Sequence, residues 1–377
     1  MTVLRPGEAR EAGLAPDRVA RIAPACAAFL GPPAPAYPGF VVLAARHGVV
    51  VVHEAGGDAV RYGAQGPVEP VPMRTDTLFD VASLSKLFTA LVVVRLAERG
   101  LLDLDAPVRA YLPGFPTVPV RSLLTHTSGL PAEIDLGPYP DHAACLAAIA
   151  AQPPAYPPGA GYRYSDLGPI TAAAVAERVT GRRLDALVAE LITGPLGLAD
   201  TGYRPLDRPL EPAVLARTAA TERQPWTGRG MVHGTVHDEN AYHLGGIAGH
   251  AGIFSTAHDL AVLAQTLLNG GSYGEVRLLG EKWAREMLRE QNAHLGPAAA
   301  RGLGWQLNQP GYMDELASPT AFGHTGFTGT SLVADPATGV LLVLLTNRVH
   351  PTREQGKDGA WRRAPARELA RAVREAD

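Results

Sequence analysis

A serine and a lysine three residues apart, Ser83 and Lys86, form a pair whose types and spacing could do chemistry. They stand where an apolar helical pattern begins, and on a helix this spacing places both side chains on one face. A hydroxyl at a helix start lies near unpaired N–H groups that favour developing negative charge, so it becomes a nucleophile if a base is near. The structural alternative is a serine that caps the helix, followed by a lysine in solvent. With three lysines in the chain, chance predicts on the order of 0.07 such pairs, so the single match favours chemistry.

Two further motifs downstream carry side chains of similar use. Tyr164 and Asp166 come just before an apolar helical pattern that starts at Leu167. The segment 322–329 (FGHTGFTG) is typical of a glycine-flanked edge strand, and it carries His324. The structural alternative for Tyr164 is an ordinary aromatic side chain packed under a turn.

A second serine and histidine, Ser128 and His126, could be mistaken for a nucleophile and its base. No G-x-S-x-G sequence surrounds them. We therefore expect them to pack at a helix end.

The elements that must position these motifs start with two strand pairs, one near each end of the chain. Residues 40–45 and 49–54 are Val-rich runs separated by a turn in which Gly48 supplies the permissive position. Residues 331–334 and 340–345 flank a second turn of sequence DPATG.

Helical patterns occupy both termini and the stretch between them. The first covers 16–30 and contains Pro24, where we expect a kink, and the last covers about 363–375. The intervening patterns are 84–99, 143–151, 167–179, 184–192 and 259–269.

This order predicts an α/β (α+β) fold in which terminal helices flank an antiparallel β-sheet and a mainly helical region is inserted. The domains would then be discontinuous. Residues 1–80 and 300–377 would form the sheet domain, and residues 81–299 the helical domain that carries the nucleophile helix. Because pockets favour domain interfaces, the remote motifs are expected to meet at this junction.

With these motifs in this order, the sequence resembles the serine β-lactamase and penicillin-binding-protein superfamily. It is most similar to the class C-like branch, which contains esterases, D-aminopeptidases and DD-peptidases. That family carries S-x-x-K, then Y-x-N, then K-T-G or H-x-G. The matching positions are Ser83 and Lys86, Tyr164 and Asp166, and His324, Thr325 and Gly326. The similarity runs from about residue 14 to 348, with supporting phrases at 123–131, 252–256 and 302–305.

The resemblance implies an acyl-enzyme mechanism. Ser83 would attack a carbonyl carbon, the backbone amides of Ser83 and Phe327 would form the oxyanion hole, and Lys86 and Tyr164 would share the proton transfers. The ordinary pKa values of these two groups, about 10.4 and 10, are too high for a base at pH 7. Either burial favours a neutral Lys86 or the nearby cation favours a Tyr164 phenolate, and the sequence leaves this choice open. The resemblance assigns substrate binding to Asp166, His324, Thr325 and Gly326.

Two positions depart from the family pattern. Asp166 stands where Asn is commoner. Its ionised carboxylate could form an ion pair with Lys86, but it would also repel anionic substrate groups. His324 replaces a lysine, so a permanent cation is lost. Both changes favour a serine hydrolase of small ester, amide or peptide-like substrates, either an esterase or a D-amino-acid amidase or peptidase. The alternatives are a class C-type β-lactamase or DD-carboxypeptidase, and a catalytically idle binding module of the same fold.

A metal-dependent hydrolase is a further alternative, because four histidines crowd into eighteen positions: His233, His237, His243 and His250. The H-E-x-x-H arrangement of a helical zinc site is absent, and the neighbouring Leu244–Gly245–Gly246 is typical of a loop. We therefore expect a role at the pocket rim or in the loop, with no metal and no cofactor.

Composition limits the partners. The formal net charge of −3 offers no field for nucleic acid or an anionic membrane. The first 21 residues are charged and lack the apolar stretch of a secretory signal, so a cytoplasmic location is expected, and prolines would break any spanning helix in 22–45. Cys26 and Cys145 are too few for a disulfide framework and are expected to be buried free thiols. The oligomeric state is left open.

Overall fold

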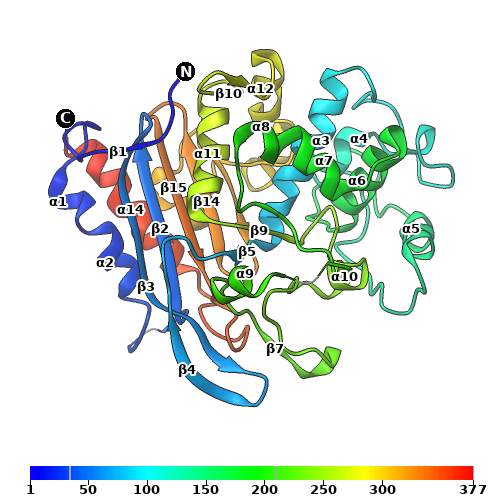
Figure 1. Ribbon diagram of the computed structural model, residues 1–377. Coiled ribbons are helices and arrows are strands. Elements are labelled where there is room, and N and C mark those ends of the chain that lie inside the picture. Colours follow the sequence, from blue (N-terminus) through cyan, green and yellow to red (C-terminus); the bar gives the residue numbers. More distant parts are fainter. Residues whose placement is uncertain (34, 209, 377) are drawn as a thin grey trace.

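An eight-stranded β-sheet forms the centre of the computed structural model, which describes residues 1–33, 35–208 and 210–376 (Figure 1). The strand order is β1–β3–β2–β15–β14–β13–β12, with β4 added to β3. β1 runs parallel to β3 and the other neighbours are antiparallel, so the expected sheet is confirmed. The strands are β1 (Arg5–Pro6), β2 (Gly39–Arg46), β3 (Val49–Gly63), β4 (Gly66–Pro72), β12 (Gln306–Leu307), β13 (Phe322–Gly326), β14 (Thr330–Asp335) and β15 (Val340–Thr346).

The first and last parts of the chain meet at the middle of this sheet. β2 pairs with β15 over seven residue pairs, from Val340 opposite Arg46 to Thr346 opposite Phe40. The two predicted hairpins, β2–β3 and β14–β15, are confirmed. Gly48 has φ of +84°, a left-handed conformation that the two-residue turn between β2 and β3 requires.

Both faces of the sheet are covered, which explains why β2 is apolar at every position from 40 to 45 instead of alternating. Val41 and Leu43 point into a core shared with the inserted helical region. Phe40 and Val42 point into a second core under the terminal helices.

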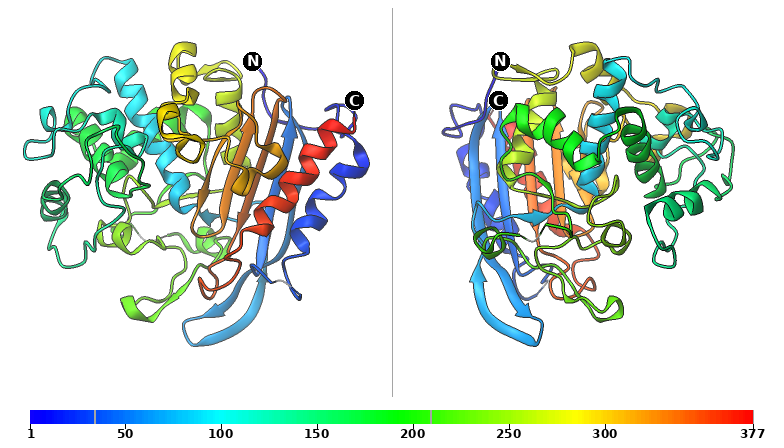
Figure 2. Two further views of the ribbon diagram at one scale, coloured as in Figure 1. Left: turned by 180° about the vertical axis from the view of Figure 1, so that it is seen from behind. Right: turned by 45° about the vertical axis from the view of Figure 1, so that its right-hand side comes forward.

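The terminal helices lie together on one face of the sheet (Figure 2). They are α1 (Pro16–Val19), α2 (Ile22–Ala27) and α14 (Ala360–Arg374). The prediction of one helix over 16–30 with a kink at Pro24 was wrong, because the helix breaks at residues 20–21. Pro24 lies in the first turn of α2. N–H groups in a first turn have no carbonyl acceptor within the helix, so a proline there costs no hydrogen bond.

The opposite face carries α11 (Ala257–Leu268) and, beyond it, the helical region (Figure 2). The predicted helices of this region form with shifts of one to two residues, except that the pattern 184–192 divides into α7 (Leu184–Val188) and a π-helical turn, η3 (Ala189–Thr193). The other helices of four or more residues are α3 (Ser85–Glu98), α4 (Val120–Leu124), α5 (His142–Ala150), α6 (Leu167–Thr180), α9 (Pro212–Ala216), α10 (Glu239–His243), α12 (Glu281–Leu288) and α13 (Pro310–Met313).

The strands of the large sheet come from the two end regions of the chain. In the described ranges, every strand of the large sheet lies outside residues 81–299, while the domain boundaries themselves stay a prediction. Cys26 and Cys145 are free and buried, as expected. Within these ranges no helix has both the length and the apolar character that crossing a bilayer requires. The short elements are α8 (Gly194–Leu196), β5 (Phe79–Asp80), β6 (Gly202–Tyr203), β7 (Arg223–Gln224), β8 (Gly230–Met231), β9 (Ile253–Ser255), β10 (Ser272–Tyr273) and β11 (Val276–Arg277), with 3₁₀ turns η1 (Ala82–Leu84), η2 (Val108–Ala110), η4 (Pro225–Thr227), η5 (Ala293–Leu295), η6 (Pro297–Ala299) and η7 (Asp314–Leu316).

Trp361 is expected to stabilise the packing of α14. Its side chain is fully buried, its Nε1 donates to the Gly356 carbonyl at 2.8 Å, and its ring meets Tyr37 edge-on at 5.6 Å. We expect Trp361→Ala to lower the free energy of unfolding by about 3–5 kcal/mol. Trp226, 59% exposed, is the matched control, and its alanine variant should change stability by less than about 1 kcal/mol. Equal denaturant midpoints for the two variants would contradict this assignment.

Candidate active site

Ser83 lies in a strained turn between β5 and α3. The turn is η1, and Ala82 has φ of +47°, a left-handed conformation that non-glycine residues rarely adopt. Asp80 holds this conformation, because its Oδ1 accepts the Ala82 amide at 2.8 Å. Strain that neighbouring bonds maintain in this way is a feature of functional turns.

Bonds from two remote segments hold the same turn. On one side, the Val81 amide donates to the Ile253 carbonyl of β9 at 3.0 Å. On the sheet side, the Thr328 hydroxyl donates to the Asp80 carbonyl at 2.7 Å and the Thr330 hydroxyl to the Val81 carbonyl at 3.0 Å. Ser83 is therefore fixed at the place where β13 ends.

Gly326 allows β13 to approach the turn this closely. A Cβ atom at this position would lie 2.5 Å from the Val81 carbonyl oxygen and 2.1 Å from the Thr330 hydroxyl oxygen. Any side chain here would push the strand away from Ser83. Thr325, Gly326 and Phe327 line the pocket in front of Ser83, while their predicted substrate-binding and oxyanion roles stay predictions.

Lys86 is buried one helical turn after Ser83, with 3% of its surface exposed. Its Nζ donates to the Ser83 Oγ at 2.8 Å and to the His250 carbonyl at 3.2 Å. The same Nζ lies 2.7 Å from Oδ1 of Asp166, the ion pair that the sequence suggested. Burial alone would lower the pKa of Lys86, but the charge of Asp166 and the contact with Tyr164 raise it above its ordinary value. Lys86 is therefore protonated at neutral pH.

Tyr164 lies beside this ion pair, with Lys86 Nζ 5.0 Å from the ring centroid. Its ring packs between two buried histidines, 4.5 Å from His126 and 6.2 Å from His324 between centroids. Burial lowers the pKa of His126 well below its ordinary value and that of His324 to about 3. Both rings are therefore neutral at pH 7 and add no positive charge beside Lys86.

His324 lies behind the pocket rather than in its lining. Its ring is buried, and its Nδ1 hydrogen-bonds the Thr325 carbonyl at 2.8 Å. The sequence placed His324 with the substrate-binding residues, whereas in the structure the exposed surface at this point comes from Thr325 and Tyr164. The Nδ1 of His126 likewise accepts the Ser165 amide at 3.1 Å, so this histidine does not activate Ser128.

The four crowded histidines have separate partners. His233 and His243 bond backbone carbonyls, His237 pairs with Glu222, and His250 pairs with Asp238 at 2.8 Å. Across residues 1–33, 35–208 and 210–376, one group has metal-ligand proximity: Asp166, Asp238 and His250. The Lys86 ammonium already contacts Asp166 there, so a metal ion would have to compete with this ammonium group for the carboxylate.

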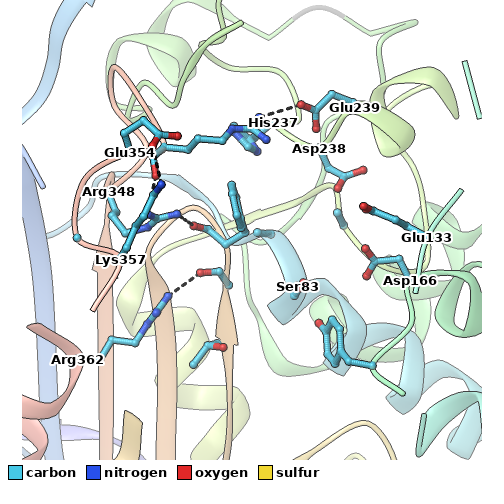
Figure 3. Close-up of a pocket in the computed structure, with 18 of the residues that line it drawn as sticks. Ser83, Glu133, Asp166, His237, Asp238, Glu239, Arg348, Glu354, Lys357 and Arg362 are labelled. Atoms are coloured by element: carbon cyan, nitrogen blue, oxygen red, sulfur yellow. Dashed lines mark hydrogen bonds and ion pairs between the residues drawn. The ribbon is translucent and has the colours of Figure 1, made fainter. Parts of the chain in front are cut away.

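These residues surround a pocket of about 730 Å³ with Ser83 at its floor (Figure 3). Motif reasoning missed most of its charged lining. A detectable signal existed for two of these residues, since Arg348 comes two residues after the end of β15 and Arg362 lies in the first turn of α14. The missed lining residues are Glu133, Asp238, Glu239, Arg348, Arg353, Glu354, Lys357 and Arg362.

The fold, together with Ser83 and Tyr164 in the pocket beside the buried Lys86, is that of a serine hydrolase. The family model described as Beta-lactamase matches residues 27–366, and the chain belongs to that family. The expected superfamily is thereby confirmed.

Curated and solved relatives agree with this assignment. The chain is 35% identical to a "Putative D-alanyl-D-alanine carboxypeptidase" of Escherichia coli K12, over an alignment covering 83% of this chain and 79% of that protein. Among solved structures, "EstCE1, a hydrolase with promiscuous acyltransferase activity" matches with TM-score 0.71 and 25% identity over 94% of this chain and 98% of that one. A penicillin-binding-protein homologue from Caulobacter crescentus has TM-score 0.73 at 23% identity, over 95% and 98% of the two chains, which shows the shared fold.

Proposed function

We propose that Ser83 is the nucleophile of this hydrolase and forms an acyl-enzyme with small ester, amide or peptide-like substrates. The observation that carries the proposal is the 2.8 Å contact between Lys86 Nζ and Ser83 Oγ. Ser83 lies in a turn whose backbone is strained at Ala82. Ser83 Oγ attacks the substrate carbonyl carbon, and its proton passes to the deprotonated form of the Lys86–Tyr164 pair, whose population rises with pH. The same pair returns the proton to the leaving group, after which water hydrolyses the acyl-enzyme.

The backbone amides of Ser83 and Phe327 form the oxyanion hole in this proposal. The position of Phe327 supports it, because Arg348 holds the Phe327 carbonyl at 2.9 Å and Arg362 holds the Gly326 carbonyl at 2.8 Å. With both carbonyls held by guanidinium groups, the Phe327 peptide has a fixed orientation next to Ser83. Preorganised donors of this kind stabilise the tetrahedral intermediate.

The free edge of β13 supports a peptide-like substrate. β12 pairs only with residues 322–323 of β13, so the edge at Thr325 and Gly326 is open towards the pocket in the described structure. An extended chain can add to such an edge through main-chain hydrogen bonds. Asp166 lines the pocket and acts through Lys86, whereas His324 acts from behind the surface through Tyr164.

We favour an esterase or D-amino-acid amidase or peptidase, because Asp166 and neutral His324 replace groups suited to anionic β-lactams. DD-carboxypeptidase activity is the second candidate, favoured by the names of the curated relatives. Nitrocefin turnover faster than that of short acyl esters would instead favour a β-lactamase. Chelator-sensitive activity would favour the metal-dependent alternative.

A fluorophosphonate probe with peptide mass spectrometry tests the nucleophile directly. We expect one covalent adduct, located on Ser83. An adduct on another residue would overturn the proposal, and no adduct together with no ester hydrolysis would favour the idle binding module.

The pH dependence tests the role of Asp166. Because Asp166 raises the pKa of Lys86, the neutral amine forms only as pH rises, so kcat/KM should increase from pH 6 into the alkaline range. Asp166→Asn removes the negative charge and should move the midpoint of this rise in kcat/KM to lower pH by about one unit. Asp17→Asn, an exposed change in α1, is the charge-matched control. An unchanged midpoint in Asp166→Asn would contradict the pairing.

We further propose that the enzyme works in the cytoplasm on a small-molecule substrate, without nucleic acid. The balanced net charge supports this partner class. Cell fractionation with an antibody tests it, and recovery outside the cytoplasm would contradict it.

A further inference from the structure

The pocket around Ser83 has two walls of opposite charge (Figure 3). The C-terminal wall is the segment 348–362, which contributes cations. The helical wall comes from the inserted region and contributes carboxylates, and Ser83 lies between the two walls. The cations are Arg348, Arg353, Lys357 and Arg362, and the carboxylates are Glu133, Asp166, Asp238 and Glu239.

The C-terminal wall carries about two net positive charges. Arg348, 7% exposed, and Arg362 bond backbone carbonyls, and in the described ranges neither lies within 4 Å of a carboxylate. Burial lowers the pKa of Arg362 to about 9, so it is still charged at pH 7. Lys357 is balanced by Glu354, which belongs to the same wall.

Two carboxylates of the helical wall have cationic partners of their own. Asp166 is neutralised by Lys86 at 2.7 Å. Asp238 lies 2.8 Å from His250. Burial opposes charge on this ring, but Asp238 raises the pKa of His250 above its ordinary value, so the pair is neutral only while His250 holds its second proton.

The rest of the helical wall has an excess of negative charge. Glu239 and Glu222 share Arg353, whose Nη2 lies 2.8 Å and 2.6 Å from their carboxylate oxygens, and Glu222 also contacts His237 Nε2 at 2.8 Å. Glu133 is exposed at the pocket rim and pairs with no cation in the part of the chain that the structure describes. In the described ranges, the helical wall therefore presents the unpaired Glu133 carboxylate, facing the two net positive charges of the other wall.

We propose that this pocket selects a short dipolar peptide, with a free ammonium group at the Glu133 side and a free carboxylate at the Arg362 side of the scissile bond. The proposal rests on the function proposed above. Buried cations without counterions are costly, and a substrate carboxylate would supply the missing charge. The two walls also reject the reversed orientation, because each repels the wrong end. A volume of about 730 Å³ suits a ligand of this size.

Calorimetry on the Ser83→Ala variant tests this selection without catalysis. The ligands are D-alanyl-D-alanine, its N-acetyl form, its C-terminal amide, and the doubly blocked form. We expect the free dipeptide to bind at least about tenfold more tightly than either singly blocked form. N-acetyl-dipeptide binding as tight as the free form, or no binding by any of the four, would overturn the proposal. Because the fluorophosphonate assay on the unmodified enzyme is independent of these affinities, failure of the nucleophile assignment is seen separately.

Glu133→Gln, in the same Ser83→Ala background, tests the ammonium side. Since Glu133 is exposed and unpaired in the described ranges, this change should not disturb folding. We expect the preference for the free over the N-acetylated dipeptide to fall about threefold or more, while the preference for the free carboxylate stays. Glu69→Gln, an exposed change on β4, is the control and should alter neither. Equal preferences in Glu133→Gln and Glu69→Gln would overturn the assignment of Glu133.

Discussion

Ser83→Ala is expected to lower kcat/KM for a short acyl ester by at least about 10⁴-fold and to abolish the covalent fluorophosphonate adduct. The substitution removes the hydroxyl that Lys86 contacts at 2.8 Å and leaves the backbone amides of the turn in place. Substrate should therefore still bind, so the loss should appear in kcat. Steady-state kinetics and intact-protein mass spectrometry measure both effects.

Ser128→Ala is the matched control, because Ser128 is a buried serine two residues after a histidine in the sequence. Its Oγ accepts the Leu130 amide at 3.3 Å, which is a structural contact. Its variant should keep kcat/KM within a few-fold of the unmodified enzyme. Undiminished hydrolysis in Ser83→Ala, or equal losses in the two variants, would refute the proposed nucleophile.

Lys86→Met is expected to have the second largest effect, a loss of at least about 10³-fold in kcat. Methionine is unbranched and only one heavy atom shorter, so it fills most of the buried space, but it can neither accept nor donate the Ser83 proton. Asp166 is then left without its 2.7 Å partner, so the free energy of unfolding should also fall, by about 2 kcal/mol.

The double variant Lys86→Met/Asp166→Asn separates catalysis from stability. Removing both charges should recover most of the lost unfolding free energy, because no buried carboxylate is left unpaired. Activity should not recover, since the proton carrier is still missing. Recovery of activity together with stability would show that Lys86 has only a structural role.

Local patterns predicted most of the fold. The turn signals around Gly48 and at 335–339 marked both hairpins, because hairpin turns depend on residues close together in the chain. Pro24 misled the prediction at the first helix, since a proline in a first turn costs nothing and its position relative to the helix start is not visible in the periodicity.

The residues of the candidate site also fall into two groups, those that the sequence predicted and those that it did not. Ser83 and Lys86 were predicted because their spacing suggests their chemistry, and Tyr164 because of the family resemblance; the structure brings the three side chains together. The charged walls were not found, because a lone Arg362 or Glu133 in a sequence is typical of a solvated surface. Their meaning depends on which charges lack partners after folding, and that depends on contacts between segments more than 200 residues apart.

The pairing of β2 with β15 has a consequence for synthesis of the protein. Roughly 300 residues separate these strands, so at about 5–20 residues per second the ribosome extends the chain for some 15–60 seconds before β2 can gain its neighbour. During that interval the nascent hairpin β2–β3 exposes a strand with open hydrogen-bonding groups and apolar side chains on both faces. A holding chaperone that binds extended apolar segments would have its best target there, and truncated chains ending before residue 340 should be the ones that aggregate.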